Sequence, residues 1–250
     1  MAKAPIRIAI LECDVTIGRL AEGYGPIFQR LLTAAAVKIK NDDGRSPTLE
    51  ISWFNVVQKP ETYPKLEDID AVLLSGSKFN SFDSDPWILN LVSFTKSILA
   101  QTRVRLIGVC FGHQIIGRAL DIPVGRSEAG WELAVTELQL SEVGKSIFGG
   151  RETIAIHQMH RDIVHGPYPA SIESLASTDR CATQGMYARN RLITVQGHPE
   201  FTKDIVAELL ERRHEGKILD DETFNEAMSR VSRDHDGLAI AEAFIRFLLE

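Results

Sequence analysis

Residues 108–112 constrain the fold of this chain more than any other segment, because they join an apolar run to a helical pattern through a cysteine. Residues 104–109 are typical of a strand buried on both faces, and residues 112–120 have the spacing of a short helix. Cys110 therefore lies at a sharp strand-to-helix turn of the kind that presents a nucleophile. Glycines two residues before and two after it are expected, because a Cβ at either place would collide across the turn. The N-terminus of the helix points at Cys110 and favours the thiolate.

A second polar motif, Gln-Gly-His-Pro-Glu, occupies residues 196–200. The apolar run before it predicts a buried strand, so His198 lies at the carboxyl edge, where open α/β sheets place their sites. Pro199 keeps His198 extended, and alternate residues of an extended segment point the same way, which brings Glu200 beside the imidazole. A carboxylate on one ring nitrogen leaves the other nitrogen to deprotonate a thiol. The two motifs together predict a catalytic triad of Cys110, His198 and Glu200.

Strand and helix patterns alternate through residue 120, which predicts an α/β, flavodoxin-like fold with a mainly parallel sheet flanked by helices. From residue 124 to 195 the pattern changes to short strands and polar loops, which indicates a small antiparallel addition. No repeat, low-complexity tract or long linker interrupts the chain, so we expect one domain over residues 1–250. The expected strands cover residues 7–11, 51–56, 71–74, 104–109, 132–140, 153–156, 174–176, 185–188 and 191–195, and the expected helices cover residues 28–39, 85–101, 112–120, 202–215, a segment after 221, and 240–248.

Composition excludes several classes of protein. The chain is 44% hydrophobic and 25% charged, which is ordinary for a globular protein, and its net charge of −6 without a basic cluster argues against nucleic-acid binding. No stretch approaches the ~20 apolar residues of a transmembrane helix, so we expect no membrane partner. Residues 1–5 lead directly into the first strand and leave no room for a signal peptide. Three widely spaced cysteines predict no disulfide framework and a reducing compartment. We therefore expect a cytoplasmic protein.

Both motifs resemble a known family. Residues 108–114, Gly-Val-Cys-Phe-Gly-His-Gln, and residues 197–200, Gly-His-Pro-Glu, resemble the nucleophile and His/Glu motifs of the class I glutamine amidotransferases. Residues 130–132 and 159–162 resemble segments of the stand-alone, GMP-synthase-like members and of the related γ-glutamyl peptidases, so the resemblance covers nearly the whole chain. The chain departs from the family at Ser75-Gly76-Ser77, where a glycine pair and a proline are usual, and at Arg161, where many synthase-type members have glycine.

The resemblance implies roles for further residues. Acyl transfer needs two N–H donors at the developing oxyanion, and the backbones of Phe111 and Gly76 are the candidates. Gln114, about one helical turn after the nucleophile, would bind the α-amino-acid end of the substrate. His160 would line the pocket from a loop, and Trp131 would form one of its walls. Structural roles stay open for these residues: a turn for Gly76, the helix surface for Gln114, and the core for His160 and Trp131.

We expect neither a metal nor an organic cofactor. His157 and His160 are three residues apart, but no His-Glu-x-x-His motif or cysteine pair accompanies them. Cys13 and Cys181 have no turn of the kind around Cys110 and no neighbouring base. Both are expected to be inert.

The expected reaction is cysteine-dependent hydrolysis of a small-molecule γ-glutamyl amide through a γ-glutamyl thioester. As a glutamine amidotransferase, the protein would supply ammonia to a synthase on a separate chain. One alternative is a γ-glutamyl peptidase that acts on glutathione or its conjugates. Another is a non-catalytic redox sensor, because related flavodoxin-like folds carry a cysteine at such a turn. His198 and Glu200 count against the sensor, which needs a reactive thiol but no base.

Overall fold

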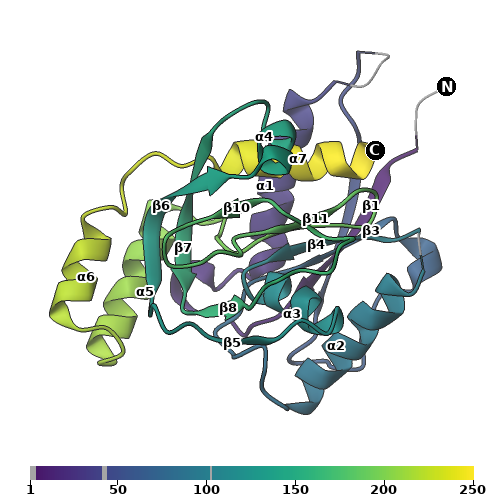
Figure 1. The fold of residues 1–250 in the computed structure, drawn as a ribbon. Coiled ribbons are helices and arrows are strands. Elements are labelled where there is room, and N and C mark those ends of the chain that lie inside the picture. Colours follow the sequence, from purple (N-terminus) through teal and green to yellow (C-terminus); the bar gives the residue numbers. More distant parts are fainter. Residues whose placement is uncertain (1–3, 41–43, 102) are drawn as a thin grey trace.

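A computed structural model describes residues 4–40, 44–101 and 103–250. The expectation of no signal peptide rests partly on residues 1–3, which lie outside these ranges. The described residues form a central seven-stranded sheet with the order β2-β1-β3-β4-β12-β11-β9 (Figure 1). Its strands are β1 (Ile6–Glu12), β2 (Leu49–Asn55), β3 (Ala71–Leu74), β4 (Arg105–Val109), β9 (Glu173–Ser174), β11 (Met186–Ala188) and β12 (Leu192–Val195). Neighbouring strands from β2 to β12 pair in parallel, and β11 and β9 add antiparallel pairs.

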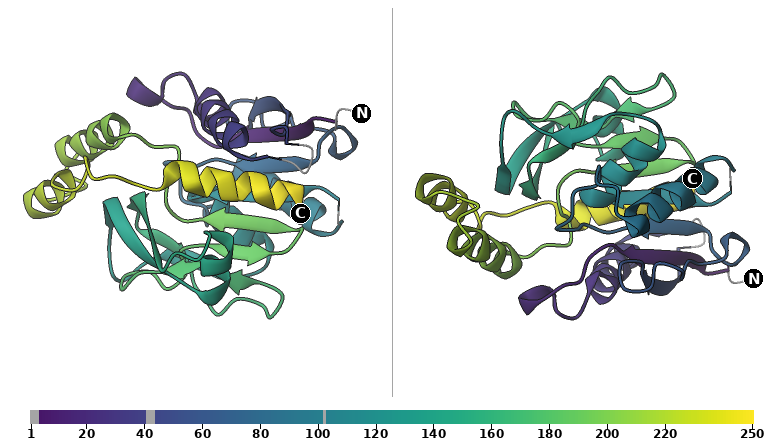
Figure 2. Two further views of the ribbon diagram at one scale, coloured as in Figure 1. Left: turned by 90° about the horizontal axis from the view of Figure 1, so that it is seen from above. Right: turned by 90° about the horizontal axis from the view of Figure 1, so that it is seen from below.

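The sheet is buried on both faces, because alternate strand residues pack on opposite sides. Ile8 and Ile10 belong to the core that includes α1 (Tyr24–Lys38) and α7 (Gly237–Leu249). Ala9 and Leu11 belong to a second core with α2 (Pro86–Leu99) and α3 (Phe111–Ala119). Figure 2 shows the two groups of helices on either side of the sheet. The predicted flavodoxin-like architecture, a mainly parallel sheet flanked by helices, is confirmed.

The predicted antiparallel addition is also confirmed. Among the described residues, β10 (Ala176–Ser177), β6 (Glu132–Leu140) and β7 (Thr153–His160) form a three-stranded sheet, and β5 (Val124–Arg126) pairs with β8 (Asp162–Val164). The strand predicted over residues 153–156 continues to His160. The short helix α4 (Glu142–Ile147) was not predicted, although its N-cap Ser141 accepts a hydrogen bond from the Gly144 N–H.

Two helices project from one end of the molecule and lie beside the β6–β7 sheet (Figure 2). They are α5 (Lys203–Glu215) and α6 (Asp221–Met228), and their N-caps Thr202 and Asp220 accept hydrogen bonds from Ile205 N and Thr223 N. Helix α5 also contacts the 3-10 turn η1 (Gly18–Leu20). A second 3-10 turn, η2, covers Leu66–Asp68. Within the described ranges, every helix is too short or too polar to cross a membrane.

The carboxyl ends of four parallel strands meet at one edge of the sheet. Asp14 follows β1, Ser77 follows β3, Cys110 follows β4 and His198 follows β12. Open α/β sheets bind their ligands at this edge. The fold therefore brings together residues that are up to 184 positions apart in the sequence.

Candidate active site

The turn at Cys110 has the strained backbone that its sequence predicts. Its φ of 51° and ψ of −104° lie in a region that residues other than glycine rarely adopt. The Cys110 N–H donates to the Val195 carbonyl at 3.0 Å, which ties the turn to the end of β12. A Cβ on Gly108 would lie 2.9 Å from the backbone of Gly112, and a Cβ on Gly112 would overlap the carbonyl oxygen of Leu74. Close packing therefore requires both glycines.

His198 and Glu200 form a buried pair beside Cys110. Their Nδ1 and Oε1 atoms are 2.8 Å apart, and their side chains are 4% and 0% exposed. The backbone N–H of His198 donates to the backbone carbonyl of His157 at 2.8 Å, which fixes this segment against β7. Burial disfavours the imidazolium, but electrostatic interactions and hydrogen bonds with Cys110 and Glu200 outweigh it and raise the pKa of His198 to about 10. The site therefore favours the imidazolium form of His198.

Two backbone N–H groups lie near this pair. Phe111 is the first residue of α3, so its N–H has no acceptor within the helix. Gly76 lies against the imidazole, since a Cβ there would be 2.7 Å from His198 Cε1. Phe111 and Gly76, the residues predicted to supply the oxyanion donors, thus lie beside Cys110 and His198, and Gly76 has no room for a side chain.

The serines on either side of Gly76 differ in what they face. The Ser75 hydroxyl is buried: it accepts from Cys13 N–H and donates to the Gly76 carbonyl, both at 2.9 Å. The Ser75 carbonyl accepts from Gly112 N–H at 3.1 Å and so joins this loop to the nucleophile turn. Ser77 lines the pocket instead. Ser75 therefore holds the loop in place and does not line the pocket.

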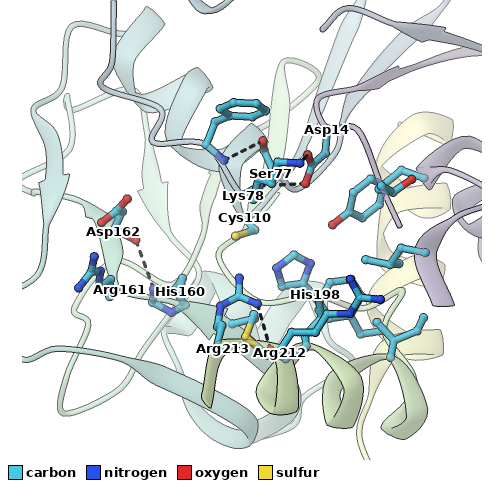
Figure 3. A pocket seen from close by; sticks show the side chains of 18 of the residues that line it. Asp14, Ser77, Lys78, Cys110, His160, Arg161, Asp162, His198, Arg212 and Arg213 are labelled. Atoms are coloured by element: carbon cyan, nitrogen blue, oxygen red, sulfur yellow. Dashed lines mark hydrogen bonds and ion pairs between the residues drawn. The ribbon is translucent and has the colours of Figure 1, made fainter. Parts of the chain in front are cut away.

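A cavity of about 400 Å³ opens in front of Cys110 and His198. Figure 3 shows these two side chains between Ser77 and Lys78 on one side and Arg213 on the other. The walls come from the segments after β1 and β3, from α3, from the end of β7 and from α5. The cavity is within the usual size range of small-molecule sites.

Gln114 lies in the pocket wall and is 3% exposed, so the alternative of a helix-surface glutamine is wrong. Its Oε1 accepts from the Ser81 hydroxyl at 3.0 Å, and its Nε2 donates to the Asp162 carbonyl at 2.9 Å and to Gln196 Oε1 at 3.2 Å. The amide is thus bonded to protein groups and braces the segment after β7.

His160 also lines the pocket, but it ends strand β7 and does not lie in the loop that the resemblance implies. Its Nε2 is 3.2 Å from Glu132 Oε2, and its Nδ1 is 3.2 Å from the Asp162 carbonyl. Burial raises the pKa of Glu132, but hydrogen bonds from His160, Thr178 and other neighbours outweigh it and lower that pKa overall. His160 is therefore held on a buried carboxylate.

Trp131 combines the two roles that the sequence leaves open. It packs against the hydrophobic core and also lines the pocket. Arg161 Cζ and Arg213 Cζ lie 5.1 and 5.6 Å from its ring centroid. Trp131 thus supports two arginines at the pocket.

Sequence reasoning missed several pocket residues. Asp14 is 8% exposed, and burial raises its pKa against the opposing charge of Lys78. Its place two residues after the end of β1 could have revealed it, because the carboxyl-edge rule applies to every parallel strand. Arg213 follows Ile205 and Leu209 at four-residue intervals on one face of α5, so its apolar helix stripe was a usable signal.

The described residues contain no group of three or more His, Cys, Asp and Glu that could hold a metal ion. His157 and His160 are three residues apart on β7 and so point to opposite faces. Cys13 and Cys181 are buried free thiols, and burial raises their pKa values to about 12 and about 11. Such thiols are poor nucleophiles.

Known proteins resemble the chain in sequence and in fold. Residues 44–213 match the glutamine amidotransferase class-I family. A glutamine amidotransferase-like protein of Schizosaccharomyces pombe is 33% identical over 97% of this chain and 98% of its own length. Gamma-glutamyl peptidase 2 of Arabidopsis thaliana is 28% identical over 93% of this chain and 91% of its own. A glutamine amidotransferase of Thermotoga maritima shares the fold, with a TM-score of 0.74 and 14% identity over 99% of this chain and 100% of its own. The chain therefore belongs to the class-I glutamine amidotransferase family.

Proposed function

We propose that the protein hydrolyses a γ-glutamyl amide and that Cys110 is the nucleophile. The observation that carries this proposal is the positive φ of Cys110 at the head of α3, with the 2.8 Å pair of His198 and Glu200 beside it. A nucleophile, a base and a group that orients the base form one catalytic unit in acyl transfer.

Acylation begins when the Cys110 sulfur bonds to the γ-carbonyl carbon and the carbonyl electron pair moves to oxygen. The N–H groups of Phe111 and Gly76 stabilise this oxyanion. As it collapses, the C–N bond breaks and the His198 imidazolium gives its proton to the leaving nitrogen. The products are a γ-glutamyl thioester and a free amine, which is ammonia when the substrate is glutamine.

Deacylation uses the same groups with water as the nucleophile. His198 takes a proton from the water as it attacks the thioester carbon, and the second oxyanion forms at the same two N–H groups. The C–S bond then breaks, which releases glutamate and restores the Cys110 thiolate. Glu200 keeps the imidazole oriented and stabilises its positive charge. Neither step calls on a metal or an organic cofactor.

We assign the leaving group to the side of the pocket shaped by Ser77 and Trp131, and the α-amino-acid end of the substrate to the side formed by Gln114 and His160. The Gln114 amide fixes the Asp162 carbonyl, and His160 is fixed by Glu132, so this wall is rigid before substrate arrives. Fixed polar groups discriminate strongly against a substrate that lacks their partner. The glutamyl part is therefore the part that the enzyme reads most strictly.

Two fates of the leaving amine fit this chemistry. An amidotransferase would pass ammonia to a synthase on a separate chain, whereas a peptidase would release an amino acid or peptide. The family and its relatives support amide hydrolysis in either case, since both glutamine amidotransferase-like and gamma-glutamyl peptidase names occur among them. A redox sensor would have no use for the buried His198–Glu200 pair, which disfavours that alternative.

The test is a mass balance of free glutamate from glutamine, glutathione, a glutathione S-conjugate and an N-acetylated γ-glutamyl amide. We expect glutamate from at least one substrate with a free α-amine and none from the N-acetylated compound. If the N-acetylated amide were hydrolysed as fast as the substrates with a free α-amine, this would contradict recognition of the glutamyl end. A protein that releases no glutamate, but in which Cys110 is reversibly oxidised, would support the redox sensor instead.

A further inference from the structure

The pocket carries an excess of positive charge, although the whole chain has a net charge of −6. Among the described residues that line it, six are Lys or Arg and three are Asp or Glu. Each of the three acids has a basic partner: Asp14 with Lys78 at 3.4 Å, Asp162 with Arg126 at 2.7 Å, and Glu208 with Arg212 at 2.6 Å. Three arginines of the lining remain without an ion pair to any described carboxylate: Arg19, Arg161 and Arg213.

Of these three arginines, Arg213 is the one on α5, and its side chain is half-buried. Its polar contact is a long hydrogen bond of 3.4 Å to the Leu209 carbonyl in its own helix, and its guanidinium lies over the Trp131 ring. Burial lowers the pKa of Arg213, against the opposing influence of Tyr24, Cys110 and other neighbours. A cation withdrawn from water without an anion is costly, and an anionic ligand would remove that cost.

The proposed reaction decides which part of a substrate Arg213 would meet. His198 must reach the leaving nitrogen to protonate it, so the leaving group lies on the His198 side of Cys110. That side is walled by the segment after β1 and by α5, which begins five residues after His198, contacts η1, and carries Leu209 and Ile205 one and two turns before Arg213. Arg213 is therefore placed on the leaving-group side.

The opposite end of the pocket already has polar and charged side chains that can bind the glutamyl group. Arg161, His160 and Asp162 lie together across from His198 in Figure 3. Glutamine has its α-carboxylate and α-ammonium at the glutamyl end, and its leaving group is ammonia. Glutamine would thus leave Arg213 without an anionic partner.

We infer that Arg213 binds a carboxylate on the leaving group, one or two residues beyond the scissile amide, so that a γ-glutamyl peptide with a free C-terminus is preferred over glutamine. This inference rests on the proposed function. A γ-glutamyl peptide carries one carboxylate more than the α-amino-acid end needs, and a guanidinium binds a carboxylate through two parallel hydrogen bonds. The Trp131 ring restrains the guanidinium and supplies a second contact.

The test uses substrate pairs that differ only in the terminal carboxylate: γ-glutamylglycine against γ-glutamylglycinamide, and glutathione against its C-terminal amide. Glutamate release gives kcat/KM for the wild-type protein and for Arg213→Gln, Arg213→Lys and Arg246→Gln. Arg246 is a matched control, because it also lies in the last turn of a helix but not at the pocket. The ratio within a pair is independent of the folded fraction of each preparation.

In at least one pair, we expect wild-type kcat/KM to favour the acid by roughly ten- to a hundredfold, the effect of one charge-assisted hydrogen bond. Arg213→Gln should bring the ratio close to one by loss on the acid alone, Arg213→Lys should keep part of it, and Arg246→Gln should keep all of it. A wild-type ratio near one in both pairs, or an unchanged ratio in Arg213→Gln, overturns the inference while glutamate release still supports the proposed function. Glutamate release from glutamine but from none of the four compounds overturns the inference alone, and absence of release from glutamine as well overturns both.

Discussion

The imidazole of His198 lies flat against the phenyl ring of Phe201, with ring centroids 3.9 Å apart and an angle of 4° between the planes. Glu200 fixes one edge of the same imidazole at 2.8 Å. Phe201 is itself stacked on Tyr24, with centroids 6.5 Å apart. The proposed base is therefore restrained both in its plane and on one face.

Phe201→Leu removes the flat surface under His198 while keeping an apolar side chain. We expect kcat to fall by roughly ten- to a hundredfold with KM nearly unchanged, because the base loses its orientation but substrate contacts remain. Phe201→Tyr, which keeps an aromatic ring under His198, should retain most of the wild-type activity. A second stacked pair in the described part of the chain, His214 and Phe224 at 4.3 Å, lies outside the pocket lining, so Phe224→Leu is the control. Equal losses in the two Leu variants would show a general stability effect.

Glu200→Gln tests the charge of the triad separately from its geometry. The Glu200 carboxylate helps to raise the pKa of His198 to about 10, so its removal lowers that pKa. The imidazolium that protonates the leaving amine is then lost at lower pH, and the alkaline limb of the kcat/KM profile should shift toward neutrality. Activity at neutral pH should fall less than on removal of Cys110. Profiles across roughly pH 6 to 11 measure this, and an unmoved alkaline limb would rule out the assigned role.

Gly76→Ala places a methyl group 2.7 Å from His198 Cε1, closer than carbon atoms tolerate. Either the imidazole or the oxyanion loop must move, so we expect kcat/KM to fall by roughly a hundredfold. Gly125→Ala is the matched control, because the nearest atom to its Cβ, His165 Nε2, is 3.4 Å away. Thermal unfolding of both variants separates loss of activity from loss of fold. Wild-type activity in Gly76→Ala would show that this loop does not contact the reacting groups.

The central sheet could be predicted because strands buried on both faces are continuous apolar runs. The strand expected over residues 71–74 has those bounds in the structure. Residues 124–195 were harder, because β9 and β10 are two residues long and exist only through their partners. Helix α4 has six residues, too few for a helical period to show. In these segments tertiary pairing decides the local structure.

The candidate site likewise has parts that the local sequence predicts and parts that depend on residues far apart in the chain. The turn at Cys110 and the contact of His198 with Glu200 depend on spacings of two residues, so local sequence predicts them. The amide partners of Gln114 are Ser81 and Asp162, which are 33 and 48 positions away. Likewise, no local pattern brings Arg213 to Trp131, because that contact depends on how α5 lies beside the β6–β7 sheet.

The most direct test of the account is glutamate release by Cys110→Ala, measured beside Cys13→Ala and Cys181→Ala with the best γ-glutamyl substrate. Cys110 is the thiol on the strained turn and lines the pocket, whereas Cys13 and Cys181 lie outside the pocket lining and have raised pKa values. We predict that Cys110→Ala lowers kcat by at least ~10³-fold, as removal of a nucleophile from a catalytic unit does, while the other two variants stay near wild type. Glutamate release by a folded Cys110→Ala protein at close to the wild-type rate would contradict the mechanism.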